Sequence, residues 1–345
     1  MNSIITIAQQ FAPTIEQLNS LGHGLINDTY LVTSTNKTFV LQRLNNSVFK
    51  QPQNIIENLE TLNRFLITQA NNQLQFPSLL TTLDKQYHYQ DNMGNYWRAL
   101  TYIENSVSYL KVTDLKQAEQ IGFALGHFHR LFNELPLDLL HTTLPDFHIT
   151  PLYLQAYQQT SASIKTPNRQ SQYCADFITQ YQRIAIDLEQ AKQQGLLKLR
   201  VIHGDPKADN FLFANHKQQV LSLIDLDTVQ SGLVHYDIGD CLRSCCQTLD
   251  GDFDLSFCRI ILKAYLQEAR HFFSSADYAF LYPAIRLLPF ELGLRFYTDY
   301  LQNNRYFKVT HAEQNLDRAV QQFKLCNSIM AQEKAIKAII DEAMG

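Results

Sequence analysis

The sequence has no long uninterrupted run of apolar residues, although 45% of its 345 residues are hydrophobic. A membrane-spanning helix needs about 20 consecutive apolar residues, and no stretch approaches that length. The N-terminal Met-Asn-Ser-Ile-Ile-Thr-Ile also lacks the basic segment and the apolar core of a secretory signal. We therefore expect a cytoplasmic protein that does not associate with a membrane.

The chain also lacks a strong charge of either sign. Its 29 Lys and Arg residues stand against 33 Asp and Glu residues, which gives a formal net charge of -4, and no long basic run occurs. Because nucleic-acid-binding proteins present a basic face or stripe, we do not expect a nucleic-acid partner. The six cysteines fit neither a zinc-ligand spacing nor a disulfide framework, and buried free thiols are the preferred interpretation.

The most informative stretch extends from Val201 to Asp227. Two short apolar runs flank the polar turn 214–219, a pattern typical of a β-hairpin. Asp205 and Asn210 lie in the loop that enters the first run, and Asp225 ends the second run. The hairpin would therefore bring these three polar side chains together at one end.

The spacing His-x-Asp-x4-Asn in this stretch matches the catalytic loop of kinases. Asp205 would accept the proton of the attacking hydroxyl group, and Asn210 and Asp225 would bind Mg²⁺ on the ATP phosphates. Each residue alone could instead cap a turn or end a strand, but all three in register favour phosphoryl transfer. Asp227 could bind a second metal ion or hydrogen-bond to the backbone, and the sequence leaves both interpretations open.

With these residues, the sequence resembles the aminoglycoside phosphotransferase and choline kinase superfamily, and within it most closely the N-acetylhexosamine 1-kinases. Two positions depart from those kinases: Leu25 replaces a His, and His203-Gly204-Asp205 replaces His-Asn-Asp. The blocks that carry the resemblance are Gly24–Val32, Phe39–Asn45, Trp97–Tyr109, Phe147–Pro151, Arg200–Asp240 and Gly293–Phe307.

The resemblance implies an α+β, two-lobed protein-kinase-like fold. Residues 1–104 would form the nucleotide-binding lobe, with a small antiparallel β-sheet and one main helix. Residues 105–345 would form a larger, mostly helical lobe that carries the catalytic hairpin and the acceptor site. The protein would act as a monomer or a homodimer.

The resemblance also implies contacts between the N-terminal lobe and ATP. Gly24 and Thr29 belong to the segment that would cover the phosphates, although a glycine in this setting is also typical of an ordinary tight turn. Tyr102 and Ile103 would connect the lobes and offer backbone groups to the adenine.

Arg43 stands where the kinase fold usually carries a Lys that contacts the phosphates. Either Glu57 or Glu60, on the helix that follows, would be its acidic partner. An exposed Arg at the end of a strand is the alternative interpretation.

The acceptor would be chosen by the C-terminal lobe. In the resembling kinases, residues that match Arg295 and Tyr306 bind the sugar near the catalytic residue that matches Asp205. The expected function is an ATP- and Mg²⁺-dependent kinase acting on the anomeric hydroxyl of an N-acetylhexosamine. Alternatives are another acceptor, such as an aminoglycoside, an amino alcohol or a different sugar, and a nucleotide-binding protein without catalytic activity.

Overall fold

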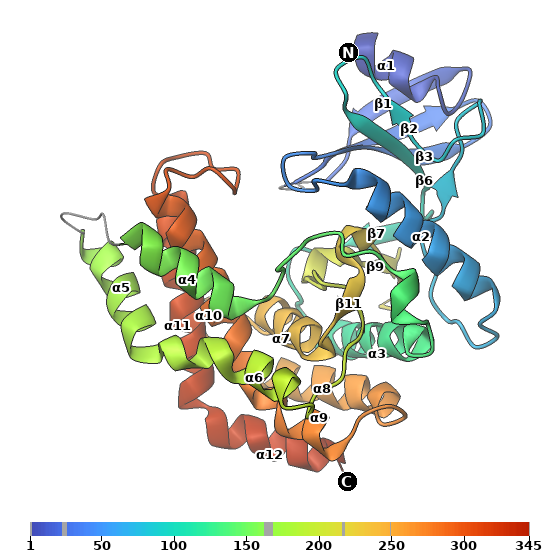
Figure 1. Cartoon of the computed structure of the whole chain (residues 1–345). Coiled ribbons are helices and arrows are strands. Elements are labelled where there is room, and N and C mark those ends of the chain that lie inside the picture. Colours follow the sequence, from blue (N-terminus) through green and yellow to red (C-terminus); the bar gives the residue numbers. More distant parts are fainter. Residues whose placement is uncertain (1, 23–25, 162–167, 216–217, 249, 345) are drawn as a thin grey trace.

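The computed structural model describes the chain except for residues 1, 23–25, 162–167, 216–217, 249 and 345. It has an N-terminal lobe built on a β-sheet and a larger, mostly helical C-terminal lobe (Figure 1). This arrangement confirms the α+β, two-lobed fold expected from the sequence. No helix within the described ranges is both long and apolar enough to cross a membrane.

The sheet of the N-terminal lobe is antiparallel, with the strand order β1-β2-β3-β6-β4, and β5 also pairs with β6. The elements of this lobe are α1 (Asn2–Ala8), β1 (Ile15–Ser20), β2 (Asp28–Ser34), β3 (Thr38–Leu44), α2 (Pro52–Ile67), β4 (Leu79–Leu80), β5 (Tyr89–Gln90) and β6 (Tyr96–Thr101).

The two faces of this sheet have different partners because side chains alternate along each strand. On one face, Phe39 and Leu41 of β3 and Trp97 of β6 pack against α1 in a small apolar core. The other face, with Val40 and Gln42, is turned toward the C-terminal lobe and lines the cavity between the lobes. The position of a residue along β3 therefore determines whether its side chain faces the cavity and can contact a ligand.

Helix α2 belongs to the N-terminal lobe by sequence but shares the apolar core of the C-terminal lobe. Ile55 and Leu59 pack in the same cluster as residues of the catalytic hairpin and the central helices. The buried Asn58 side chain donates to the carbonyl oxygens of His141 and Val229, both at 2.9 Å, and accepts the His141 backbone N–H at 2.8 Å. These bonds attach α2 to the larger lobe.

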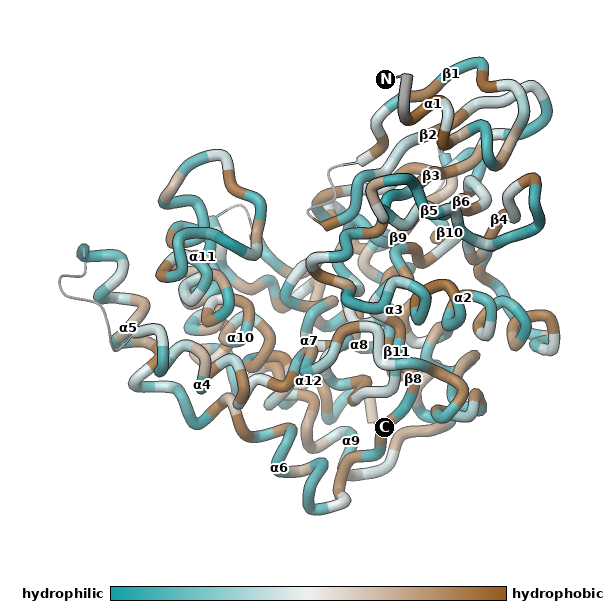
Figure 2. Tube along the Cα trace, turned by 45° about the horizontal axis from the view of Figure 1, so that its top comes forward, coloured by the Kyte–Doolittle hydropathy of each residue, from teal (hydrophilic) through white to brown (hydrophobic). Residues whose placement is uncertain are grey.

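The C-terminal lobe is built around the packed helices α3 and α8. They approach closely at two glycines of α3: a Cβ atom on Gly122 would lie 2.3 Å from the Ile261 carbonyl oxygen, and one on Gly126 would lie 2.7 Å from that of Tyr265. In Figure 2, hydrophilic and hydrophobic stretches alternate along the helices, as expected when each helix buries one face. The helices of this lobe are α3 (Leu115–Phe132), α4 (Thr150–Ser161), α5 (Arg169–Tyr181), α6 (Asp187–Gln193), α7 (Val234–Cys245), α8 (Leu255–Ala269), α9 (Ser275–Ala279), α10 (Leu281–Leu301), α11 (Gln314–Ala331) and α12 (Glu333–Met344).

The predicted catalytic hairpin is present. Strands β9 (Phe211–Ala214) and β10 (Val220–Leu223) pair in antiparallel fashion, and β7 (Ser106–Ser108) adds to β9 directly after the connection between the lobes. A second pair, β8 (Arg200–Ile202) with β11 (Gln230–Gly232), holds the two ends of the catalytic stretch together. The six cysteines are free and buried, as the sequence indicated.

Candidate active site

The loop between β8 and β9 turns sharply at Gly204, whose φ is 88°. A Cβ atom there would lie 2.8 Å from the backbone oxygen of Thr228, so the position requires glycine. His203 ties the loop to β10, because its Nε2 donates to the Ile224 carbonyl oxygen at 2.9 Å and its Nδ1 accepts the Asp205 backbone N–H at 3.2 Å. These roles need a neutral imidazole, and burial lowers the pKa of His203 accordingly.

Helix α7 supports the same loop through Asp237. Its carboxylate accepts the backbone N–H groups of His203 at 2.6 Å and Gly204 at 2.9 Å, and His129 Nε2 lies 2.8 Å from it. Burial alone would raise the pKa of Asp237, but the hydrogen bond from His129 and the other donors lower it. An ionised carboxylate therefore fixes the backbone on the N-terminal side of Asp205.

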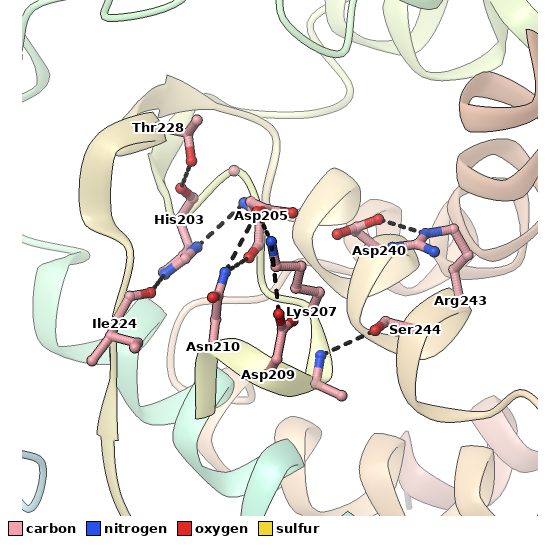
Figure 3. Close-up of polar contacts among 12 residues, drawn as sticks. His203, Asp205, Lys207, Asp209, Asn210, Ile224, Thr228, Asp240, Arg243 and Ser244 are labelled. Carbon is pink, nitrogen blue, oxygen red and sulfur yellow. Dashed lines mark hydrogen bonds and ion pairs between the residues drawn. The ribbon is translucent and has the colours of Figure 1, made fainter. Parts of the chain in front are cut away.

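Asp205 points toward two residues of its own loop (Figure 3). Lys207 Nζ lies 3.1 Å from its carboxylate, and the Asn210 side-chain amide donates to its backbone oxygen at 2.7 Å. The Asp205 side chain is 34% exposed and thus reachable by a substrate. Burial raises its pKa, while the Lys207 ammonium group offsets part of the rise.

Asp225 follows β10 with a left-handed φ of 66°, a conformation that Asp tolerates better than most residues and that is frequent at functional sites. It lines the cavity between the lobes together with Asn210 and Lys207. Enclosure in the cleft, followed by the neighbouring carboxylate of Asp227, raises the pKa of Asp225 to about 7. This crowding of negative charge fits a site for a cation.

The donor set is also suitable for Mg²⁺. Asp225 offers a carboxylate, and Asn210 keeps its side-chain oxygen for a ligand because its amide nitrogen makes the bond to Asp205. Mg²⁺ commonly takes one or two protein oxygens and completes its shell with water and phosphate oxygens. Within the described residues, no group of three or more His, Cys, Asp and Glu side chains forms a closed metal site.

Asp227 has both carboxylate oxygens occupied by the protein. Asn27 donates to Oδ2 at 2.8 Å, and the guanidinium group of Arg98 forms an ion pair with Oδ1. The sequence left open a second metal ion or a hydrogen bond to the backbone; in the structure both oxygens are instead bound by side chains.

The cavity between the lobes has a volume of about 300 Å³. The predicted nucleotide contacts Thr29, Tyr102 and Ile103 all line it, and the apolar Val40 and Leu100 form part of its wall. Gln42 donates to the Thr29 hydroxyl at 3.1 Å. Gly24 and Leu25 lie outside the described residues.

Arg43 does not face this cavity, which contradicts the prediction that it contacts phosphates. It lies opposite Trp97 in the β3–β6 register, on the face that packs against α1, and its half-exposed side chain forms an ion pair with Asp28. Neither predicted partner binds it: Glu57 pairs with His141 at 2.7 Å, and Glu60 with Arg64 at 3.9 Å. The prediction was wrong by one residue, which in a strand selects the opposite face.

A second cavity, of about 240 Å³, lies in the C-terminal lobe between α4, α10 and the segment 302–307. It brings together the predicted acceptor contacts Arg295 and Tyr306, with the guanidinium carbon 5.8 Å from the centre of the Tyr306 ring. Three further rings surround Arg295 at 5.0 to 5.6 Å, from Phe147, Tyr153 and Phe307.

His148 joins this second cavity to the catalytic loop. Its Nε2 lies 2.9 Å from the Gly204 carbonyl oxygen, and its Nδ1 lies 2.8 Å from Glu291, one helical turn before Arg295. The Thr150 hydroxyl donates to the other oxygen of Glu291 at 2.6 Å. Burial alone would lower the pKa of Arg295, but the neighbouring Tyr153, Tyr306 and Glu291, with a smaller contribution from Asp205, raise it.

Sequence reasoning missed three residues of this site. Lys207 had a local signal, because a Lys two residues after the catalytic Asp stands in the same loop, but no role was assigned to it. Arg98 and His148 lie in two of the blocks that carry the resemblance, but no role was assigned to them, since their partners Asp227 and Glu291 are 129 and 143 residues away along the chain.

A two-lobed kinase-like fold with Lys207, Asn210 and Asp225 at a cavity between the lobes, and Asp205 in contact with Lys207, is typical of phosphotransferases. The model of the phosphotransferase enzyme family matches residues 17–272. The chain therefore belongs to that family.

Solved structures of similar fold cover nearly the whole chain. The aminoglycoside phosphotransferase of Alicyclobacillus acidocaldarius matches with a TM-score of 0.69 and 13% identity, over 98% of this chain and 96% of that one. A microcompartment-associated aminopropanol kinase (TM-score 0.65) and a spectinomycin phosphotransferase in complex with ADP and spectinomycin (0.64) each match at 15% identity, over 96% of this chain and 98% of theirs. At these identities the likeness concerns the fold.

Proposed function

We propose that the protein is an ATP- and Mg²⁺-dependent kinase that phosphorylates a hydroxyl group of a neutral sugar, with the anomeric hydroxyl of an N-acetylhexosamine as the first candidate. The observation that carries this proposal is the position of Asp205. It contacts Lys207, which lines the cavity between the lobes, and the neighbouring Gly204 is linked through His148 to Glu291, one helical turn before Arg295 of the second cavity.

The cavity between the lobes is the proposed ATP site. The similar spectinomycin phosphotransferase was solved with ADP, and the wall formed by Val40, Leu100 and the linker residues Tyr102 and Ile103 offers an apolar slot for adenine. The opposite end of the cavity carries Lys207, Asn210 and Asp225, where the phosphate groups would lie.

In the proposed reaction, Asp205 orients the acceptor hydroxyl and takes its proton as the γ-phosphoryl group transfers. Its raised pKa makes it a better proton acceptor than an ordinary carboxylate. Lys207 holds the Asp205 side chain and adds positive charge beside the transferring group. A Mg²⁺ ion held by Asn210 and Asp225 would neutralise charge on the ATP phosphates.

The charges of the second cavity support a neutral acceptor. Arg295 is a cation within it, and the only other charged residue among its described lining is Asp299. The Asp299 carboxylate is already used by three donors: the backbone N–H groups of Tyr306 (2.8 Å) and Phe307 (3.0 Å) and the Asn315 amide (2.9 Å). No carboxylate of this lining is left for an ammonium group, which disfavours aminoglycosides and amino alcohols.

A sugar would use the remaining groups of this cavity. The exposed ring of Tyr306 can stack on a sugar ring, and the Arg295 guanidinium can donate to hydroxyl or acetamido oxygens.

The first test concerns the base. Replacement Asp205→Asn should lower kcat by about 10²- to 10⁴-fold, because the general base is lost, while ADP affinity measured by calorimetry should stay unchanged. The control Asp341→Asn, on the exposed surface of α12, should keep full activity. Full turnover in Asp205→Asn would refute the assignment of the base.

The second test identifies the acceptor. ADP release should be measured with a panel of N-acetylhexosamines, other neutral sugars, amino alcohols and aminoglycosides. We expect turnover with neutral sugars, and a rise in KM for them in Arg295→Gln. Faster turnover of aminoglycosides than of neutral sugars would contradict the charge argument. A protein that binds ADP but forms no ADP from ATP with any acceptor would instead be non-catalytic.

A further inference from the structure

We propose that Arg98, on β6, binds the phosphate groups of the nucleotide and so performs the task for which the kinase fold usually carries a Lys on β3. The inference rests on the proposed function, because it takes the ligand of the cavity between the lobes to be a nucleotide. It concerns a residue on a different strand from the one that the sequence indicated.

Strand β3 places no cation in the cavity. Its residues that face the cavity are Val40 and Gln42, and Arg43 lies on the opposite face. The phosphates of a nucleotide bound here would therefore find an uncharged amide at the position of the usual Lys.

Arg98 lies directly opposite Gln42 in the antiparallel register of β3 and β6, on the same face of the sheet. Its Nε and Nη2 donate to the Gln42 side-chain oxygen at 3.1 and 2.7 Å. Nη2 also forms the ion pair with Asp227, whose other oxygen is held by Asn27. The positive charge is thus one strand away from its usual place, with its own acidic partner.

One nitrogen of this guanidinium group is left without a partner. Arg98 is only 1% exposed, and Nη1 is buried and has no hydrogen-bond acceptor. Of the buried, unpartnered side-chain atoms found among the described residues, it alone belongs to a residue that lines this cavity. A buried charged donor without an acceptor is costly, which indicates that a ligand supplies the acceptor.

The position of Arg98 along the cavity selects the phosphates rather than the adenine. Leu100, on the same face of β6, lies beside the linker where the adenine would bind, and Arg98 is two residues, about 7 Å, farther along the strand. Asp225 lines the same cavity, and Arg98 pairs with Asp227, only two residues farther along the chain from Asp225. A planar guanidinium group is well suited to phosphate oxygens.

The test compares a ligand with phosphates and one without. Calorimetric titrations with ADP and with adenosine should be run on the wild type, on Arg98→Lys, and on Arg98→Gln combined with Asp227→Asn, which removes both charges of the buried pair together. The control is Arg43→Gln, which removes an Arg from the other face of the same sheet.

We expect the double variant to weaken ADP binding by about 10- to 100-fold, the loss of a charge-assisted hydrogen bond, with adenosine affinity unchanged. Arg98→Lys should retain the pair with Asp227 but lose the second arm of the guanidinium fork, so its ADP affinity should fall between those of the wild type and the double variant. The control should bind both ligands like the wild type. An equal loss of affinity for ADP and adenosine, or no loss for ADP, would show a purely structural role and overturn the inference.

Two further outcomes separate this inference from the proposed function. If the wild type binds neither ADP nor adenosine, both the proposed function and this inference are overturned. If the wild type binds ADP, and the ratio of ADP to adenosine affinity is the same in the double variant, only this inference is overturned. If the Arg98 variants do not fold, a crystal structure of the wild type with ADP decides: Nη1 within about 3.5 Å of a phosphate oxygen supports the inference, and Nη1 bound only to water or protein overturns it.

Discussion

The buried pair of His148 and Glu291 gives a quantitative prediction about stability. Both groups that face the imidazole, the Gly204 carbonyl oxygen and the Glu291 carboxylate, are acceptors. Both ring nitrogens must therefore carry hydrogen, and the ring must be a cation. Burial alone would lower the pKa of His148, but Glu291, the Gly204 carbonyl and the charge of Asp240 together raise it.

The perturbation is His148→Asn. The φ of His148 is 61°, and Asn tolerates that left-handed conformation better than Ala or Gln, so the backbone is spared. The change removes the cation in hydrogen-bond contact with the Glu291 carboxylate, which is 1% exposed, and leaves only Arg295, 4.0 Å away. Removal of one member of a buried pair costs about 3–5 kcal/mol, a large part of a typical unfolding free energy of about 5–15 kcal/mol.

The assay is urea unfolding followed by circular dichroism, applied to a double-mutant cycle of His148→Asn and Glu291→Gln. The double variant removes both members of the His148–Glu291 pair together, so it should lose less than the sum of the two single variants. The control is His141→Asn, because His141 also lies 2.7 Å from a Glu, but both side chains of that pair are more than 40% exposed. Its loss should stay below about 1 kcal/mol.

The stabilisation should also depend on pH. The pKa of His148 is raised in the folded protein, so its contribution is complete below the ordinary value of 6.5 and is lost as pH rises through the folded value. The pKa of Glu291 is lowered despite burial, because His148 opposes it, so its contribution is complete above 4.5 and is lost as pH falls through the folded value. The difference between the wild type and His148→Asn should therefore be greatest between pH 4.5 and 6.5. A difference below about 1 kcal/mol there, the range of an exposed pair, or one that grows at higher pH, would refute the assignment of the buried cation.

Three further predictions concern packing and accessibility. Gly122→Ala should destabilise the protein by about 1–3 kcal/mol through the clash with α8. The control Gly195→Ala should show only the smaller cost of backbone strain, because φ there is 73° but no atom lies within 4 Å of the added Cβ. Equal losses of unfolding free energy in chemical denaturation would contradict the close helix contact. Asn58→Ala should cost about 2–4 kcal/mol in the same assay because buried backbone groups lose their partners, and a loss below about 0.5 kcal/mol, typical of surface changes, would show that α2 is not anchored there. The six cysteines should react with a thiol reagent only after unfolding, since all are buried, and rapid labelling of the native protein would contradict their burial.

The parts of the site that were predictable from the sequence are those in which spacing along the chain fixes spacing in three dimensions. Asp205, Asn210 and Asp225 lie within one loop and one hairpin; Asn210 and Asp225 line the same cavity, and Asn210 donates to the Asp205 backbone oxygen. The fold was predictable from the resemblance, whose matching blocks are spread over nearly the whole chain.

The parts that were not predictable depend on a strand's face or on distant partners. Arg43 and Gln42 are neighbours in sequence, yet only the register with β6 reveals which of them faces the cavity. Arg98 reads as an ordinary residue of a strand until Asp227 is placed beside it. His148 likewise acquires a task only when Gly204 and Glu291 approach from separate elements.

The attachment of α2 to the larger lobe has a consequence for regulation. Protein kinases commonly switch activity by moving the corresponding helix toward or away from the nucleotide. Here its apolar side is immersed in the neighbouring core and Asn58 ties it at mid-length. We therefore expect the sheet and α1 to move relative to α2 and the C-terminal lobe during turnover. Because α2 stays in place, we expect the enzyme to be constitutively active. Its rate in the cell should then depend on the concentrations of its two substrates.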